Sequence, residues 1–196
     1  MRVDLYMRIG INTGFIIFLF FVSVHSWAQE GNFLKVDPKQ YVVWDENRPL
    51  TWDDYLLVKS DSIDLGVTAL TAVTHSIRGG ITKGKPNFQV YVLFKRRKSW
   101  TTTTDDDQLF EHERLHFDLA ELYGRKLRKQ IEAMGNQGIT KLSEYRKSIK
   151  FLLSEFKRKS ALYDRETFHG ALSEKQLEWR NFVSSEMQRL HKYKFI

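Results

Sequence analysis

The pattern of side chains changes near Asp106, and this change restricts the fold more than any other feature of the sequence. From about residue 32 to residue 100, β-prone runs such as Tyr41-Val42-Val43-Trp44 stand between turn signals. Beyond Asp106, apolar residues recur at helical spacing. We expect three long helices there, over about residues 106–134, 140–163 and 173–191. Strands followed by helices predict an α+β domain.

Both ends of the first expected helix are marked. The acidic run Asp105-Asp106-Asp107 follows several threonines and supplies an N-cap, with negative charge at the positive end of the helix. The sequence Gly135-Asn136-Gln137-Gly138 breaks the helix again.

Residues 112–116 of this helix read H-E-R-L-H. Helix geometry places His112 and His116 one turn apart on one face, so that both imidazoles can bind a single metal ion. Glu113 then lies beside the first ligand, where it can take a proton from water rather than bind the metal. A zinc ion in such a site makes hydroxide available at neutral pH. The motif predicts a zinc hydrolase, and most simply a metalloprotease with Glu113 as the general base.

A catalytic zinc site usually has three protein ligands, so the chain must supply one more. The metzincin arrangement, with a glycine and a third histidine shortly after the motif, is absent, because Leu119 and Leu122 occupy those positions. His169 is the first candidate, since it lies at an expected helix end and Gly170 permits close backbone approach. We predict His112, His116 and His169 as the metal ligands.

The alternatives for the third ligand that stay open are Asp164, Glu166, His75 and a helical glutamate, Glu144 or Glu155. Asp118 is expected to accept the N–H of a ligand imidazole.

The first 28 residues have the layout of a secretory signal peptide. Arg2 and Arg8 precede an apolar run over residues 15–24, and Ser26 and Ala28 are the small residues before the expected cleavage point. We predict cleavage after Ala28 and one mature domain over residues 29–196. The apolar run is short for a membrane span, so we expect a secreted or periplasmic protein without a stable anchor. An uncleaved anchor is the alternative.

The composition narrows the chemistry and the partners. The chain has no cysteine, so a metal site must use His, Asp or Glu, which suits a catalytic site better than a structural one. The formal net charge is +7, but basic runs such as residues 157–159 recur beside acids such as Glu155. This pattern is typical of solvated helix faces, and we predict no nucleic-acid partner.

Three segments together resemble a family, the bacterial predicted secreted zinc-dependent proteases, long catalogued as a domain of unknown function. They are residues 48–55 (RPLTWDDY), the motif with its continuation over residues 112–127, and residues 163–170 (YDRETFHG). The resemblance implies a zincin-like fold, with a small, mainly antiparallel N-terminal sheet followed by an active-site helix and two further long helices. It also implies zinc ligation by His112 and His116, with Glu113 as the catalytic base, and it supports a functional role at His169.

The expected activity is hydrolysis of a peptide or protein substrate. Tyr163, close to the candidate third ligand, is predicted to donate a hydrogen bond to the oxyanion. The alternative from another class is an exported zinc-binding protein of the cell envelope without turnover, with Asp164 or Glu166 as a further ligand. The intact Glu113 favours a hydrolase, because a purely structural site needs no base. A zinc amidase acting on cell-wall peptide would share the chemistry and differ only in substrate.

Overall fold

The computed structural model describes residues 36–59 and 67–195. Within this part of the chain the strands form two three-stranded sheets. The first has the order β1-β5-β4 and is antiparallel throughout, with strands Tyr41–Val43, Lys85–Lys95 and Val73–Thr82. The second has the order β2-β6-β3, with strands Leu56–Leu57, Trp100–Thr101 and Ala69–Leu70. Only the β2–β6 pair among these is parallel, so the prediction of mainly antiparallel strands is confirmed.

Three long helices follow the strands in the described part of the chain, and the α+β prediction is therefore confirmed. They are α1 (Asp107–Asn136), α2 (Leu142–Thr167) and α3 (Ser173–Arg189). Short 3₁₀ helices occupy Trp52–Asp54, Arg96–Lys98 and His191–Tyr193.

All described residues belong to one compact unit. No helix among them is long and apolar enough to cross a bilayer. The predicted signal peptide, residues 1–28, lies outside the described residues and stays a prediction.

The N-terminus of α1 lies where the sequence predicts it. The carboxylate of Asp106 accepts a hydrogen bond from the backbone N–H of Leu109 at 2.8 Å, which satisfies one of the free donors at the helix start. The helix ends at Asn136, and Gly138 then adopts a left-handed backbone with φ of 72°.

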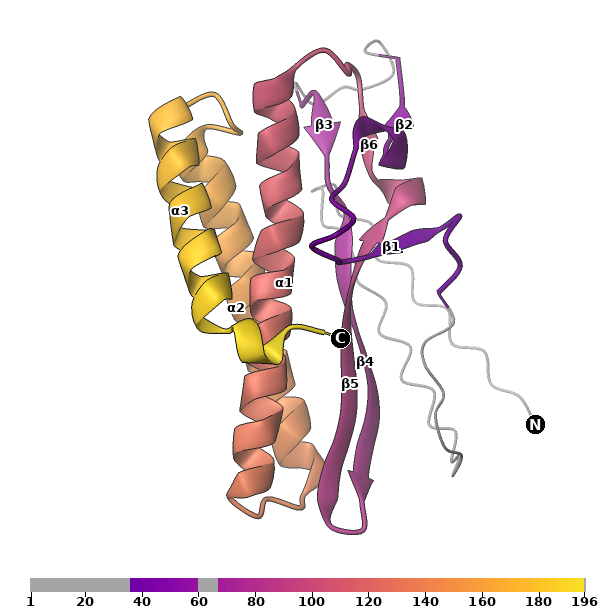
Figure 1. The fold of residues 1–196 in the computed structure, drawn as a ribbon, viewed down its shortest axis with the longest axis vertical. Coiled ribbons are helices and arrows are strands. Elements are labelled where there is room, and N and C mark those ends of the chain that lie inside the picture. The colour runs from indigo at the N-terminus through magenta and orange to yellow at the C-terminus, as the bar shows by residue number, and fades with distance from the viewer. Residues whose placement is uncertain (1–35, 60–66, 196) are drawn as a thin grey trace, which may run out of the picture. The chain divides into compact units, whose positions relative to one another are not determined.

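The α1 helix is the central element of the fold. It packs against β4 and β5 on one side and against α2 and α3 on the other (Figure 1). Leu119 and Leu122 pack with α3 residues in one core cluster, while Phe117 and Ala120 join a second cluster on β5. Burial of each large apolar side chain stabilises the fold by about 1.5–3 kcal/mol. Because α1 is covered on several faces, its buried polar side chains all require partners.

Glu121, Arg125 and Arg128 form a buried ionic cluster on α1, C-terminal to the H-E-R-L-H motif, in which the buried polar groups are paired. The side chain of Glu121 is 1% exposed and accepts hydrogen bonds from Arg125 at 3.1 Å and from Arg128 at 2.9 Å. The two guanidinium groups also donate to the backbone carbonyls of Met187 and Tyr193. The cluster thus attaches the C-terminal segment to α1.

Replacement of Glu121 by alanine should lower the free energy of unfolding by about 3–5 kcal/mol, because it leaves buried guanidinium groups without their counter-ion. Urea unfolding of the purified protein measures this change. The matched control is Glu144→Ala on the exposed face of α2, which should change stability by less than about 0.5 kcal/mol. Equal effects of the two substitutions would contradict the role given to Glu121.

Candidate metal centre

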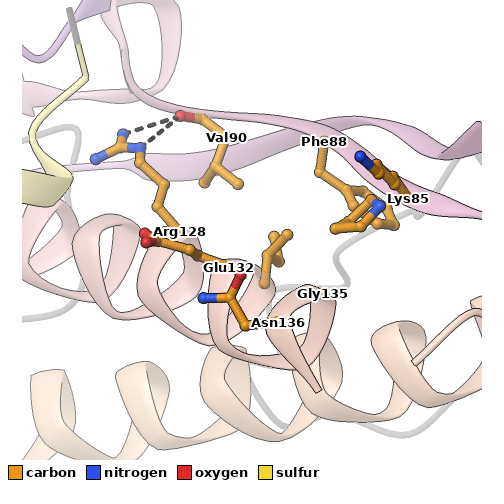
Figure 2. A pocket seen from close by; sticks show the side chains of 9 residues that line it. Lys85, Phe88, Val90, Arg128, Glu132, Gly135 and Asn136 are labelled. Carbon is orange, nitrogen blue, oxygen red and sulfur yellow. Dashed lines mark hydrogen bonds between the residues drawn. The ribbon is translucent and has the colours of Figure 1, made fainter. Parts of the chain in front are cut away.

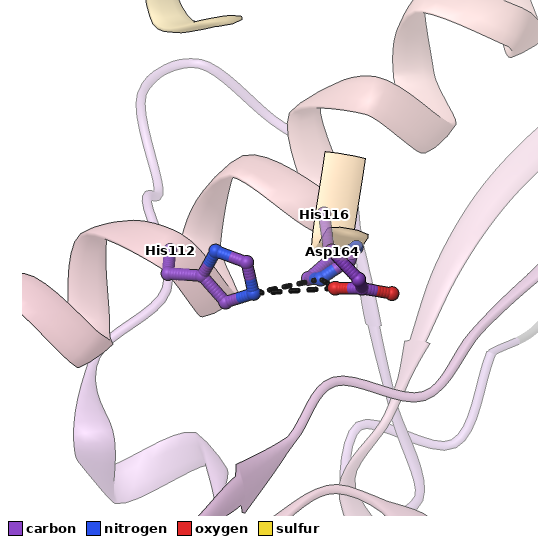
Figure 3. Close-up of side chains that lie close together, drawn as sticks. All are labelled: His112, His116 and Asp164. Atoms are coloured by element: carbon purple, nitrogen blue, oxygen red, sulfur yellow. Dashed lines mark hydrogen bonds and ion pairs between the residues drawn. The ribbon is translucent and has the colours of Figure 1, made fainter. Parts of the chain in front are cut away.

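Three potential metal ligands converge between α1 and α2. His112 and His116 project from α1, and Asp164 projects from α2 toward both of them (Figure 3). Oδ1 of Asp164 lies 2.8 Å from Nε2 of His116 and 3.3 Å from Nε2 of His112, and the two Nε2 atoms are 3.3 Å apart. Ligand atoms bound at about 2.0–2.1 Å around a tetrahedral zinc ion lie about 3.3 Å apart. The arrangement of the three side chains therefore fits a zinc ion, with only the His116–Asp164 pair closer than that spacing.

The group is largely shielded from solvent and contains an ionised carboxylate. The side chain of His112 is 2% exposed, that of His116 12% and that of Asp164 31%. Burial raises the pKa of Asp164, but hydrogen bonds from His112 and His116 outweigh this effect and hold its pKa below the ordinary value. An ionised carboxylate between two imidazoles attracts a cation.

The Nδ1 atoms of both imidazoles, which face away from Asp164, also have hydrogen-bond partners. Nδ1 of His112 lies 3.2 Å from Oε1 of Gln176 on α3, and Nδ1 of His116 lies 3.1 Å from Oγ of Ser160 on α2. The ring of Tyr163 stacks on His112 with centroids 4.6 Å apart. Such contacts to the outer nitrogen fix the orientation of metal-binding histidines and leave Nε2 directed at the ion.

Glu113 is buried beside this group but does not belong to it. Its side chain is 5% exposed, and Oε2 has no hydrogen-bond partner among the described residues. A buried carboxylate oxygen without a partner costs about 1–3 kcal/mol, or more when charged. The position therefore favours a water molecule or another hydrogen-bond donor next to Glu113, and the prediction that it is not a metal ligand agrees with its place outside the group.

Comparison with protein-family models assigns the chain to a family. Residues 70–170 match the model of a family described as "Bacterial protein of unknown function (DUF922)", and the match covers more than half of the chain. The chain belongs to this family. The matched range includes His112, His116 and Asp164, while the family description names no activity. No curated protein and no solved structure matches the chain.

His169, predicted as the third ligand, does not lie in this group, and Asp164 is its third member instead. Helix α2 does not end near Tyr163 but continues to Thr167, which puts Asp164 on the helix face that meets α1. Phe168 and His169 then both adopt left-handed backbone, with φ of 50° and 53°. The side chain of His169 is exposed and is not a member of the ligand group.

The glycine after His169 is the residue of this turn that touches the centre. A Cβ atom on Gly170 would lie 2.9 Å from Cβ of His112, and its φ is 88°. Gln108 donates to the carbonyl of Gly170 at 2.6 Å, and the N–H of Gly170 donates to Oγ1 of Thr167 at 3.2 Å. The turn thus lets its backbone pack directly on the first histidine.

Tyr163 also has a different place from the one predicted. Its side chain is fully buried, and its hydroxyl donates to Oε1 of Gln176 at 2.8 Å. Burial raises the pKa of Tyr163. The phenol therefore supports His112 and Gln176, and its hydroxyl is not directed at an oxyanion.

The remaining candidates have partners outside the centre. Glu166 accepts from the indole N–H of Trp179, and Asp118 accepts from that of Trp44 rather than from an imidazole. His75 donates to the carbonyl of Ala120, and burial lowers its pKa to about 4. The two helical glutamates on α2 also lie outside the group: Glu155 pairs with Arg158, and Glu144 is exposed.

A cavity of about 490 Å³ lies elsewhere, between β5 and the C-terminal half of α1 (Figure 2). Phe88 and Ile131 are among its lining residues, and Arg128 at its edge donates to the carbonyl of Val90. No histidine lines this cavity, so it offers no chemistry comparable with that of the centre.

Replacement of Gly170 by alanine should weaken the centre and the fold together. The new methyl group would clash with His112, and the left-handed backbone adds strain, so we expect a loss of about 2 kcal/mol in the free energy of unfolding. Zinc affinity should fall as well, because His112 must move. Gly138→Ala serves as the control: it has a similar φ of 72°, but its added Cβ meets nothing within 4 Å. If both variants bound zinc like the wild type, the packing of Gly170 on His112 would not matter for the centre.

Proposed function

We propose that this protein is an exported zinc-dependent metallopeptidase with a zincin-like arrangement of its site. The observation that carries the proposal is the convergence of two imidazole nitrogens and one carboxylate oxygen, all within 4.8 Å of one another, beside the unpaired Oε2 of Glu113. Strands that precede a helix with both histidines support the zincin-like part of the proposal.

The donor set favours zinc. Imidazole nitrogen and carboxylate oxygen suit Zn²⁺, and the absence of cysteine excludes thiolate ligation. His112, His116 and Asp164 would hold the ion, and the group has only these three members in the described part of the chain. Three protein ligands are typical of a catalytic site, which keeps one position for water or substrate. When bound, the zinc ion supplies Lewis acidity, which acidifies water and polarises the scissile carbonyl.

The protein's own groups then handle the proton and the geometry. Glu113 accepts the proton of the attacking water on its free Oε2 and returns it to the amine that leaves. Gln176 and Ser160 hold the imidazoles in place, while Tyr163 packs on His112. Burial excludes bulk water from Glu113 and strengthens each of these electrostatic contacts.

Sequence features support a location and a partner for this activity. The signal-peptide pattern over residues 1–28 supports export to the periplasm or the medium, and the predicted partner is a peptide or protein substrate. A zinc-binding protein without turnover remains the rival function, and the free oxygen of Glu113 favours the peptidase over it.

The identity of the third ligand can be tested by zinc affinity. Asp164→Asn should weaken zinc binding by about 100-fold or more, because it removes the anionic ligand. His169→Ala should bind zinc within about twofold of the wild type, since its side chain lies outside the group. Competition with a fluorescent zinc chelator measures both constants. The opposite order of the two variants would restore His169 as the ligand.

The role of Glu113 can be tested separately. Glu113→Gln should keep zinc but lose peptide hydrolysis by a factor of at least about 10². The assay is cleavage of a peptide library from a digested bacterial proteome, read by mass spectrometry, with His169→Ala as the active control. A zinc-loaded wild type that cleaves nothing would favour the zinc-binding protein without turnover. Full activity in Glu113→Gln would contradict its role as base.

A further inference from the structure

The amide of Gln176 is a buried polar group at the meeting point of the three helices. Its residue lies on α3 and is 4% exposed. Oε1 lies 3.2 Å from Nδ1 of His112 on α1 and 2.8 Å from the hydroxyl of Tyr163 on α2. Each of these contacts joins α3 to another helix, and no sequence motif indicates this role of Gln176.

The distances determine which end of the amide faces the histidine. A separation of 2.8 Å is typical of an O–H···O hydrogen bond, and N–H···O bonds are usually somewhat longer. The phenol of Tyr163 has one proton, and its other acceptor, the carbonyl of His112, is farther away at 3.2 Å. The hydroxyl therefore donates to the amide oxygen of Gln176.

An oxygen at this position fixes the tautomer of His112. An amide oxygen can only accept, so Nδ1 of His112 must carry a proton, and in the neutral ring that can bind a metal the lone pair is then on Nε2. The reversed amide would donate to Nδ1 and shift the proton to Nε2, which would block metal ligation. The partner of His116 differs in this respect, because the hydroxyl of Ser160 can either donate or accept.

We propose that Gln176 is a positioning residue that selects the Nδ1–H tautomer of His112 and so makes its Nε2 a metal ligand. The inference rests on the metal centre of the proposed function. It assigns to α3 a part in metal binding, although α3 supplies no ligand. Tyr163 contributes by orienting the amide of Gln176.

The test compares substitutions at Gln176 with controls on the same helix. Gln176→Leu removes the acceptor and should weaken zinc binding about 10–100-fold, whereas Gln176→Glu keeps an acceptor and should bind zinc at least as tightly as the wild type. Gln188→Leu makes the same change at an exposed position of α3 and should leave zinc affinity unchanged. Val183→Ala removes core packing on α3 and should lower stability while zinc affinity stays within about twofold.

Nitrogen NMR of the histidine side chains gives a readout that a purely structural role would not change. The neutral His112 of the metal-free wild type should be protonated on Nδ1; the metal-free protein is used because zinc bound through Nε2 would leave the proton on Nδ1 whatever its partner. Wild-type zinc affinity in Gln176→Leu, or a His112 protonated on Nε2, would overturn the inference. A wild type that binds no zinc would overturn the metal centre itself, which distinguishes the two failures. The spectrum of the wild type decides the question even if Gln176→Leu does not fold.

Discussion

The burial of α1 between the sheet and the other helices is the constraint on which the rest of the structure depends. A helix covered on several faces can carry polar side chains only where partners meet them. Glu121 and Arg125 are buried on α1 and satisfy each other, with help from Arg128. His112 and Glu113 are buried about two to two and a half helical turns before Glu121 and are only partly satisfied from within the protein.

The two polar regions of α1 therefore serve different purposes. Around Glu121, two guanidinium groups contact one carboxylate, and the backbone carbonyls of Val90 and of the C-terminal segment accept further hydrogen bonds from them. Around Asp164, the partners of the carboxylate are two imidazoles, whose charge depends on protonation. The first carboxylate already has two permanently charged partners, while the second favours an added cation. This difference within one helix is the physical reason to place a metal at the histidines.

Sequence patterns predicted the parts of the structure that depend on local interactions. The first helix was placed nearly correctly because Asp106 caps it and the Gly135–Gly138 segment ends it. The pairing of His112 with His116 follows from helix geometry alone. Asp164 was only an alternative to His169 as the third ligand, because the end of α2 depends on Thr167 and the left-handed residues after it. With α2 extended, Asp164 falls one turn after Ser160, which was the available signal. Gln176 could not be predicted, because its role depends on the packing of α3 against both other helices.

The central claim, that His112, His116 and Asp164 hold a zinc ion, is tested most directly by a crystal structure of the zinc-loaded protein with anomalous data at the zinc edge. The account predicts one strong peak at about 2.0–2.2 Å from Nε2 of both histidines and from a carboxylate oxygen of Asp164. Glu113 should lie nearby without binding the ion. A peak that includes His169 or Glu113 as a ligand, or no peak between α1 and α2, would contradict it.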